Sequence, residues 1–161
     1  MAISPLKRIL VIDDDIDLLM LLERRLSTEG YLVETAASIP EAEEIIPLIL
    51  PDLLLLDINV KGEDGRQLCY KLKKLQPHPP LKVIIMTGFD FDTGRAILFG
   101  ADDLVIKPIN SEFLLSRLEF HLFPSLNNEE SVAVKILEAM PELEGIDTEE
   151  PFFYKPQSEL K

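Results

Sequence analysis

The sequence predicts an α/β fold built on a doubly wound parallel sheet. Short apolar runs alternate with longer segments in which apolar side chains recur every three or four positions, as expected for strands that alternate with helices. The clearest run is Leu53–Leu56, whose four leucines between turn residues are typical of a strand buried on both faces. Because successive strands separated by helices pair in parallel through crossovers, helices are expected on both faces of the sheet.

Five strands are expected, each a short run of β-branched or leucine side chains: residues 8–12, 31–36, 53–57, 82–87 and 104–106. The first helix covers residues 16–28 and ends at Gly30. The second begins at Pro40–Glu41, and Pro47 is expected to shorten or kink it.

Three further helices complete the predicted fold. The third covers residues 65–75 and is separated from the next strand by the prolines of residues 77–80. A short fourth helix covers residues 93–99, and a fifth begins at Asn110 or Ser111, either of which can cap it. Since crossovers of this kind are right-handed, the simplest five-stranded sheet has the flavodoxin-like strand order 2-1-3-4-5.

Composition limits the classes of function. The 161 residues carry 29 acidic and 16 basic side chains, and this net charge of −13 argues against general binding to nucleic acid or to anionic membranes. No apolar run approaches the roughly 18 residues that a transmembrane helix needs, and no signal-peptide layout precedes Asp13. Cys69 is the single cysteine, so no internal disulfide is possible and a reducing, cytoplasmic location is expected.

The last part of the chain differs from the rest in composition. We expect one domain over residues 1–123 and an acidic extension over residues 124–161, which holds 9 acidic and 3 basic side chains and one helix at about 129–140. The extension is too short and too acidic to be a winged-helix DNA-binding domain, so we expect the chain to signal by binding a protein partner. The apolar stripe of its helix can bind that partner, bind a second copy in a homodimer, or pack on its own domain.

Charged and polar side chains follow the predicted strands where each strand ends. In the predicted strand order, Asp13 and Asp14 of the first strand meet Asp57 of the third at one crevice. Three carboxylates together need a cation, and their hard oxygen ligands suit Mg²⁺. Thr87 ends the fourth strand and Lys107 follows the fifth, and both can contact a bound anion. The set predicts a phosphoryl-handling site in which a carboxylate forms an acyl phosphate.

Several motifs of the chain resemble the receiver domain of two-component response regulators. The resemblance covers about residues 6–122 and is carried by five short segments: Val11–Asp15, Leu54–Asp57, Asp64–Gly65, Met86–Gly88 and Gly100–Pro108. It implies a signalling module that catalyses only its own phosphorylation and dephosphorylation. The phosphoryl donor would be a histidine kinase, a phosphotransfer protein or a small acyl phosphate.

The resemblance also implies a role for each residue of the predicted site. Asp57 would be the phosphoacceptor. Asp13, Asp14 and Asp57 would bind Mg²⁺ together with the backbone carbonyl of Asn59. Thr87 and Lys107 would contact the phosphoryl group, while Asp15 would begin a helix rather than bind the metal.

The chain departs from the usual receiver pattern at several positions. Lys61 stands where the family usually has proline, and Leu104 replaces an aromatic or histidine side chain whose rotation reports phosphorylation. The segment from Thr87 to Lys107 is two residues shorter than usual, so the fourth helix or the loop before it should be shortened. Phe89 is bulky and apolar and is expected to shield the acyl phosphate from water. These departures predict a normal metal site with an unusual conformational readout.

Two other interpretations are open at this point. A receiver-like scaffold would bind its partner independently of phosphorylation, which the missing aromatic side chain favours. A phosphatase of the haloacid-dehalogenase type would use Asp13 and Asp15 as its Asp-x-Asp motif. That second interpretation leaves Asp57 without a role, and Ile16 and Asp17 are not the small residues usual after the motif.

Overall fold

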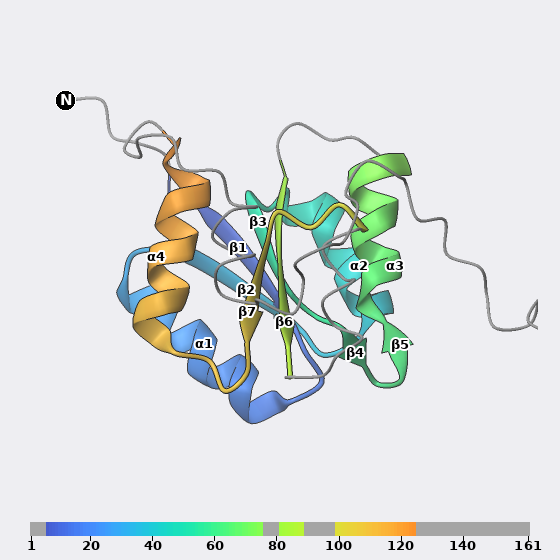
Figure 1. Cartoon of the computed structure of the whole chain (residues 1–161), viewed down its shortest axis with the longest axis horizontal. Coiled ribbons are helices and arrows are strands. Elements are labelled where there is room, and N and C mark those ends of the chain that lie inside the picture. Colours follow the sequence, from blue (N-terminus) through green and yellow to red (C-terminus); the bar gives the residue numbers. More distant parts are fainter. Residues whose placement is uncertain (1–5, 76–80, 89–98, 125–161) are drawn as a thin grey trace, which may run out of the picture.

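The structure is a computed structural model that describes residues 6–75, 81–88 and 99–124. Its centre is a five-stranded parallel sheet of order β2-β1-β3-β6-β7, which is the predicted order 2-1-3-4-5 (Figure 1). The predictions for the prolines at 77–80, for Phe89, for most of the short helix at 93–99 and for the extension beyond Pro124 lie outside the described residues.

The strands confirm the predicted apolar runs to within a residue at each end. Their bounds are β1 (Arg8–Ile12), β2 (Leu32–Ala36), β3 (Leu53–Asp57), β6 (Lys82–Thr87) and β7 (Asp103–Ile106). The central strand β3 pairs with β1 on one side and β6 on the other, and its four leucines are fully buried. Because all five strands run in the same direction, their carboxyl ends meet at one edge of the sheet.

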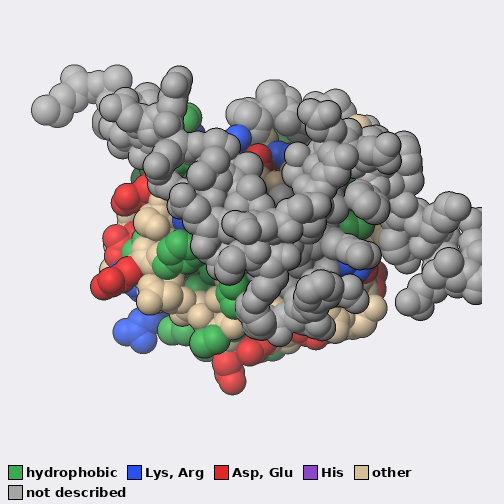
Figure 2. All heavy atoms as spheres, viewed as in Figure 1, with side chains coloured by type: hydrophobic (Ala, Val, Ile, Leu, Met, Phe, Trp, Pro, Cys, Tyr) green, Lys and Arg blue, Asp and Glu red, His purple; other side chains and the backbone are tan. Residues whose placement is uncertain are grey.

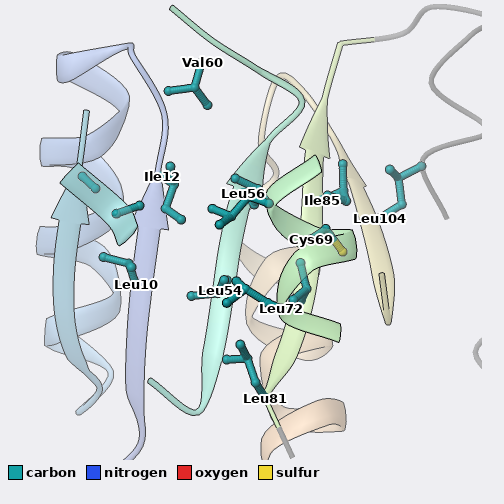
Figure 3. Packing of buried hydrophobic residues seen from close by; sticks show 14 residues of the cluster. Leu10, Ile12, Leu54, Leu56, Val60, Cys69, Leu72, Leu81, Ile85 and Leu104 are labelled. Atoms are coloured by element: carbon teal, nitrogen blue, oxygen red, sulfur yellow. The ribbon is translucent and has the colours of Figure 1, made fainter. Parts of the chain in front are cut away.

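Helices cover both faces of the sheet (Figure 1). Helices α1 (Ile16–Thr28) and α4 (Ser111–Leu122) lie on one face, and α2 (Ile39–Ile49) and α3 (Gly65–Tyr70) lie on the other. Alternate residues of β3 point to opposite faces, so Leu54 and Leu56 belong to one core cluster (Figure 3) while Leu53 and Leu55 belong to the other.

The helix ends show how local sequence fixes these elements. The side chains of four residues cap the helices by accepting a hydrogen bond from a backbone N–H: Asp15, Ser38, Asp64 and Asn110. The expectation that Asp15 begins a helix is therefore confirmed. Pro47 lies inside α2 without ending it there, since the helix continues to Ile49.

Two features of the chain differ from the predicted elements. The expected third helix changes after Tyr70 into one π turn, η1 (Lys71–Leu75). Between β3 and α3 the chain forms a small antiparallel hairpin of β4 (Asn59–Val60) and β5 (Glu63–Asp64), which the sequence pattern did not predict.

Among the described residues, no helix has the length and apolar character needed to cross a membrane.

Candidate functional site

Three carboxylates meet at the carboxyl edge of the sheet. Asp13 follows β1 and is fully buried, Asp57 ends β3 and is half-buried, and Asp14 is exposed. One oxygen atom of each side chain lies within 4.8 Å of the others. The backbone N–H of Asp15 donates to Asp13 Oδ1 at 2.9 Å and so helps to fix its orientation. The structure therefore brings together the three acidic side chains that the strand order predicts.

Lys107 reaches into the same cluster from β7. Its Nζ atom lies 2.5 Å from Asp13 Oδ2 and 3.4 Å from Asp57 Oδ1. The backbone N–H of Lys107 donates to the carbonyl of Thr87 at 2.6 Å, which ties the lysine to the end of β6. The peptide bond that follows, Lys107–Pro108, is cis. The ammonium group thus contacts both the Asp13 carboxylate, which follows β1, and the Asp57 carboxylate at the end of β3.

The electrostatics of the site follow from this crowding. Burial raises the pKa of Asp57, and the neighbouring charge of Asp13 raises it further, while Lys107 opposes both effects. Burial alone would lower the pKa of Lys107, but the hydrogen bond to Asp13 and the charge of Asp57 raise it overall. The lysine stays protonated, and an added cation beside Asp57 would favour the ionised carboxylate.

Thr87 and Asn59 complete the predicted set. Thr87 ends β6, is 2% exposed, and donates its hydroxyl to the carbonyl of Gly88 at 2.9 Å. Asn59 begins the β4–β5 hairpin, and its side-chain oxygen accepts the backbone N–H of Gly62 at 3.0 Å. Both residues lie next to strand ends at the carboxyl edge, and their roles toward a metal ion or phosphoryl group stay predictions.

Two contributions to this edge were not predicted from the sequence. The backbone N–H of Lys61 donates to Asp14 Oδ2 at 3.0 Å. Gly65 begins α3 so close to β3 that a Cβ atom there would lie 2.1 Å from the backbone oxygen of Asp57. The Asp64–Gly65 pair was a signal for the second contact, because only glycine permits such an approach between backbones.

Comparison with known proteins identifies the family to which this fold belongs. A family model described as the response regulator receiver domain matches residues 9–119. The chain belongs to this family. The match includes every residue of the predicted site, from Asp13 to Lys107.

Named relatives agree with this membership. The chain is 35% identical over 116 residues to the phosphate regulon transcriptional regulatory protein PhoB of Rhizobium meliloti, covering 71% of this chain and 51% of that protein. It is 37% identical over 113 residues to the response regulator PleD of Caulobacter vibrioides, covering 69% of this chain and 25% of that one. The chain therefore spans about half or less of the length of these curated relatives.

A solved receiver domain has the same architecture. The CheY-like response regulator receiver domain protein from Methanospirillum hungatei superimposes with a TM-score of 0.65 at 35% identity, covering 71% of this chain and 91% of that one. This agreement confirms the flavodoxin-like fold and the signalling class.

Receiver domains bind Mg²⁺ at an acidic pocket, and the residues present here fit that ion. The donors of the cluster are carboxylate oxygens, the hard ligands that Mg²⁺ prefers, and they lie close enough to share one ion. The partly exposed cluster also leaves room for the water ligands that Mg²⁺ usually keeps. Burial and the charge of Asp13 raise the pKa of Asp57, so a cation bound beside it would favour its ionised form.

Proposed function

We propose that the chain accepts a phosphoryl group on Asp57 in a Mg²⁺-dependent reaction and thereby changes its binding to a protein partner. Asp13, Asp14 and Asp57 would hold the ion with the backbone carbonyl of Asn59. The observation that carries the proposal is the convergence of three carboxylates and Lys107 at one edge, with oxygens of the three acids within 4.8 Å. The receiver family match over residues 9–119 supports the same chemistry.

The reaction needs little more than positioning and charge compensation. One oxygen of Asp57 attacks the phosphorus, a new P–O bond forms, and the bond to the donor's nitrogen or oxygen breaks with its electron pair leaving on the donor. Bound Mg²⁺ offsets the charge of the phosphoryl oxygens. Lys107, now paired with Asp13 and Asp57, is placed to turn toward the new phosphoryl group, and the Thr87 hydroxyl can exchange Gly88 for a phosphoryl oxygen.

A direct test maps the modified residue. The protein is incubated with Mg²⁺ and acetyl phosphate, the acyl phosphate is reduced with borohydride to homoserine, and the peptides are identified by mass spectrometry. We expect homoserine at position 57. Reduction at Asp13 or Asp14 instead, with none at Asp57, would contradict the assignment.

We propose a histidine kinase or phosphotransfer protein as the phosphoryl donor, the kind of protein with which receiver domains interact. Helices α1 and α4 both begin at the edge that carries Asp57 and lie on the same face of the sheet, and we propose that the donor binds at their N-terminal ends. Three large apolar side chains are exposed there: Ile16 at 54%, Met20 at 63% and Phe113 at 48%. Figure 2 shows hydrophobic side chains gathered over this part of the molecule.

Met20→Asp tests this donor surface. Transfer from a phosphohistidine donor should slow by about tenfold, which corresponds to about 1.4 kcal/mol of lost binding, while transfer from acetyl phosphate should not change. Leu48→Asp, at a side chain 81% exposed on α2, is the matched control and should change neither reaction. Equal rates for wild type and Met20→Asp with the protein donor would rule out this surface.

The output is a second part of the proposal. We assign the receiver to residues 1–123 and a separate acidic extension to residues 124–161, with a protein rather than a nucleic acid as the partner because the chain carries a net charge of −13. Deleting residues 124–161 should leave phosphorylation of Asp57 intact. A folded deletion variant that no longer accepts the group would contradict this division.

One observation favours the scaffold alternative. Leu104 is 6% exposed and belongs to the core cluster that contains Cys69 and Ile85 (Figure 3), so its side chain is packed rather than free to move between two positions. A partner could then bind without sensing phosphorylation. Affinity for the partner that stays the same after saturation with beryllofluoride would favour the scaffold, and a change would favour the switch.

A further inference from the structure

The turn that follows the phosphoacceptor strand has an unusual backbone. Lys61 and Gly62 join β4 to β5 as a two-residue loop, with φ of 52° at Lys61 and 83° at Gly62. Positive φ at both central residues is the pattern of a type I′ turn, which matches the twist of a tight hairpin. Glycine adopts it freely, but a lysine pays a conformational cost, so the position is held by the surrounding contacts.

Proline, the usual residue at this position of the family, is incompatible with this turn. Its ring fixes φ near −65°, and it has no backbone N–H. In this chain that N–H is used, because it donates to Asp14 Oδ2 at 3.0 Å, 47 residues away in the sequence. The donor in this contact is the main-chain N–H, and the lysine side chain is exposed.

We infer that the main chain of Lys61 is a positioning element for Asp14 in the metal site, an inference that rests on the function proposed above. Asp14 is exposed, and a free carboxylate there would have to be ordered when the ion binds. The two proposed metal ligands after β1 each accept a hydrogen bond from one backbone donor, Asp13 from Asp15 and Asp14 from Lys61. One oxygen of Asp14 is thereby oriented while the other stays available.

The hairpin also connects Asp14 to Asn59. Asn59 and Asp64 form the closing pair of the β4–β5 hairpin, and the Gly62 N–H donates to the Asn59 side chain at 3.0 Å. The loop that orients Asp14 therefore also positions the residue whose carbonyl we assign to the ion. Groups that orient metal ligands typically change metal affinity by about 10- to 100-fold. Since the family usually manages without this donor, we expect the lower end of that range.

Three variants and the wild type test the inference by Mg²⁺ titration calorimetry. Lys61→Pro removes the N–H and should weaken Mg²⁺ binding by about tenfold. Lys61→Gly keeps the N–H and should bind like wild type. Gly62→Ala is the matched control, since it strains the same turn but keeps both backbone donors, the Lys61 N–H to Asp14 and the Gly62 N–H to Asn59, and its Cβ meets nothing within 4 Å. It should lower stability and leave Mg²⁺ affinity unchanged.

Unchanged affinity in a folded Lys61→Pro protein, or an equal loss in Gly62→Ala, would overturn the inference. If Lys61→Pro does not fold, amide hydrogen exchange decides. The Lys61 amide should exchange at least about tenfold faster in Asp14→Ala than in wild type, because a hydrogen bond to a charged acceptor is lost. Equal exchange would refute the contact. A wild type that binds no Mg²⁺ would instead refute the proposed function, and the exchange experiment would still test the contact.

Discussion

Gly65 leaves no room for a side chain beside the phosphoacceptor strand. A Cβ atom at this position would lie 2.1 Å from the backbone oxygen of Asp57, 3.2 Å from its carbonyl carbon and 3.2 Å from Leu56 Cδ1. Ordinary contact needs about 3.5 Å, so Gly65→Ala requires a shift of more than about 1 Å between α3 and β3. The nearest atom belongs to the backbone, so no side-chain rotation can relieve the clash.

The cost can be worked out from these contacts. Overpacking of this kind costs about 1–3 kcal/mol. Displacing α3 also weakens the hydrogen bond from the Gly65 N–H to the Ile58 carbonyl, which is 2.6 Å long and contributes about 1 kcal/mol. We therefore expect a loss of about 2–4 kcal/mol in the free energy of unfolding. A misplacement of about 1 Å at a reacting group can slow a reaction by about 10²-fold, and we expect such a fall in phosphorylation by acetyl phosphate.

The assay combines urea unfolding with a time course of intact mass. Gly30→Ala is the control, because its φ of 92° makes alanine strained while nothing lies within 4 Å of the added atom. It follows α1, at the end of the sheet away from Asp57, and should cost about 1 kcal/mol without slowing phosphorylation. A Gly65→Ala protein that is folded and phosphorylated at the wild-type rate would refute the reasoning.

Three further predictions concern titratable groups that are buried or half-buried. Asp103→Asn should lower the free energy of unfolding in urea by about 3–5 kcal/mol, because the buried Asp103 carboxylate contacts Arg117 at 2.5 Å and His121 at 2.7 Å. Phosphorylation of the folded variant should continue. A loss of stability below about 1 kcal/mol would contradict this. Asp57→Asn should stabilise the Mg²⁺-free protein at neutral pH, because the pKa of Asp57 is raised in the folded protein and its ionised form therefore lowers stability. The gain should disappear below the ordinary pKa of 3.8, where Asp57 is protonated in both the folded and the unfolded protein. A variant that is less stable than wild type at neutral pH would contradict this. Cys69, whose pKa burial raises to about 12, should resist iodoacetamide in the folded protein and react in urea, so rapid labelling without denaturant would contradict its burial.

Periodicity predicts the strands, and the simplest arrangement with right-handed crossovers predicts their order. Leu53–Leu56 and the runs around it are buried on both faces, and parallel pairing then places Asp13, Asp14 and Asp57 at one edge whatever the details of the loops. The position of Lys107 follows from the same reasoning, because it comes directly after the last strand of the sheet, β7. These predictions depend only on alternating apolar segments and on the handedness of crossovers.

Contacts that depend on particular backbone angles or on tertiary packing were not predictable. The β4–β5 hairpin requires positive φ at Lys61, a conformation that lysine rarely adopts and that no local pattern indicates. Asp103 lies outside the predicted strand at residues 104–106, yet it begins β7 and pairs with Arg117 and His121. That pairing depends on how α4 packs against the edge strand, which apolar spacing alone does not determine.

The most direct test of the central claim is the intact mass of the protein after incubation with acetyl phosphate, with and without Mg²⁺, for wild type and Asp57→Asn. We expect wild type to gain one phosphoryl group only when Mg²⁺ is present, and Asp57→Asn to gain none under either condition. An equal gain in Asp57→Asn, or no gain in a wild type that binds Mg²⁺, would contradict the assignment of Asp57 as the phosphoacceptor.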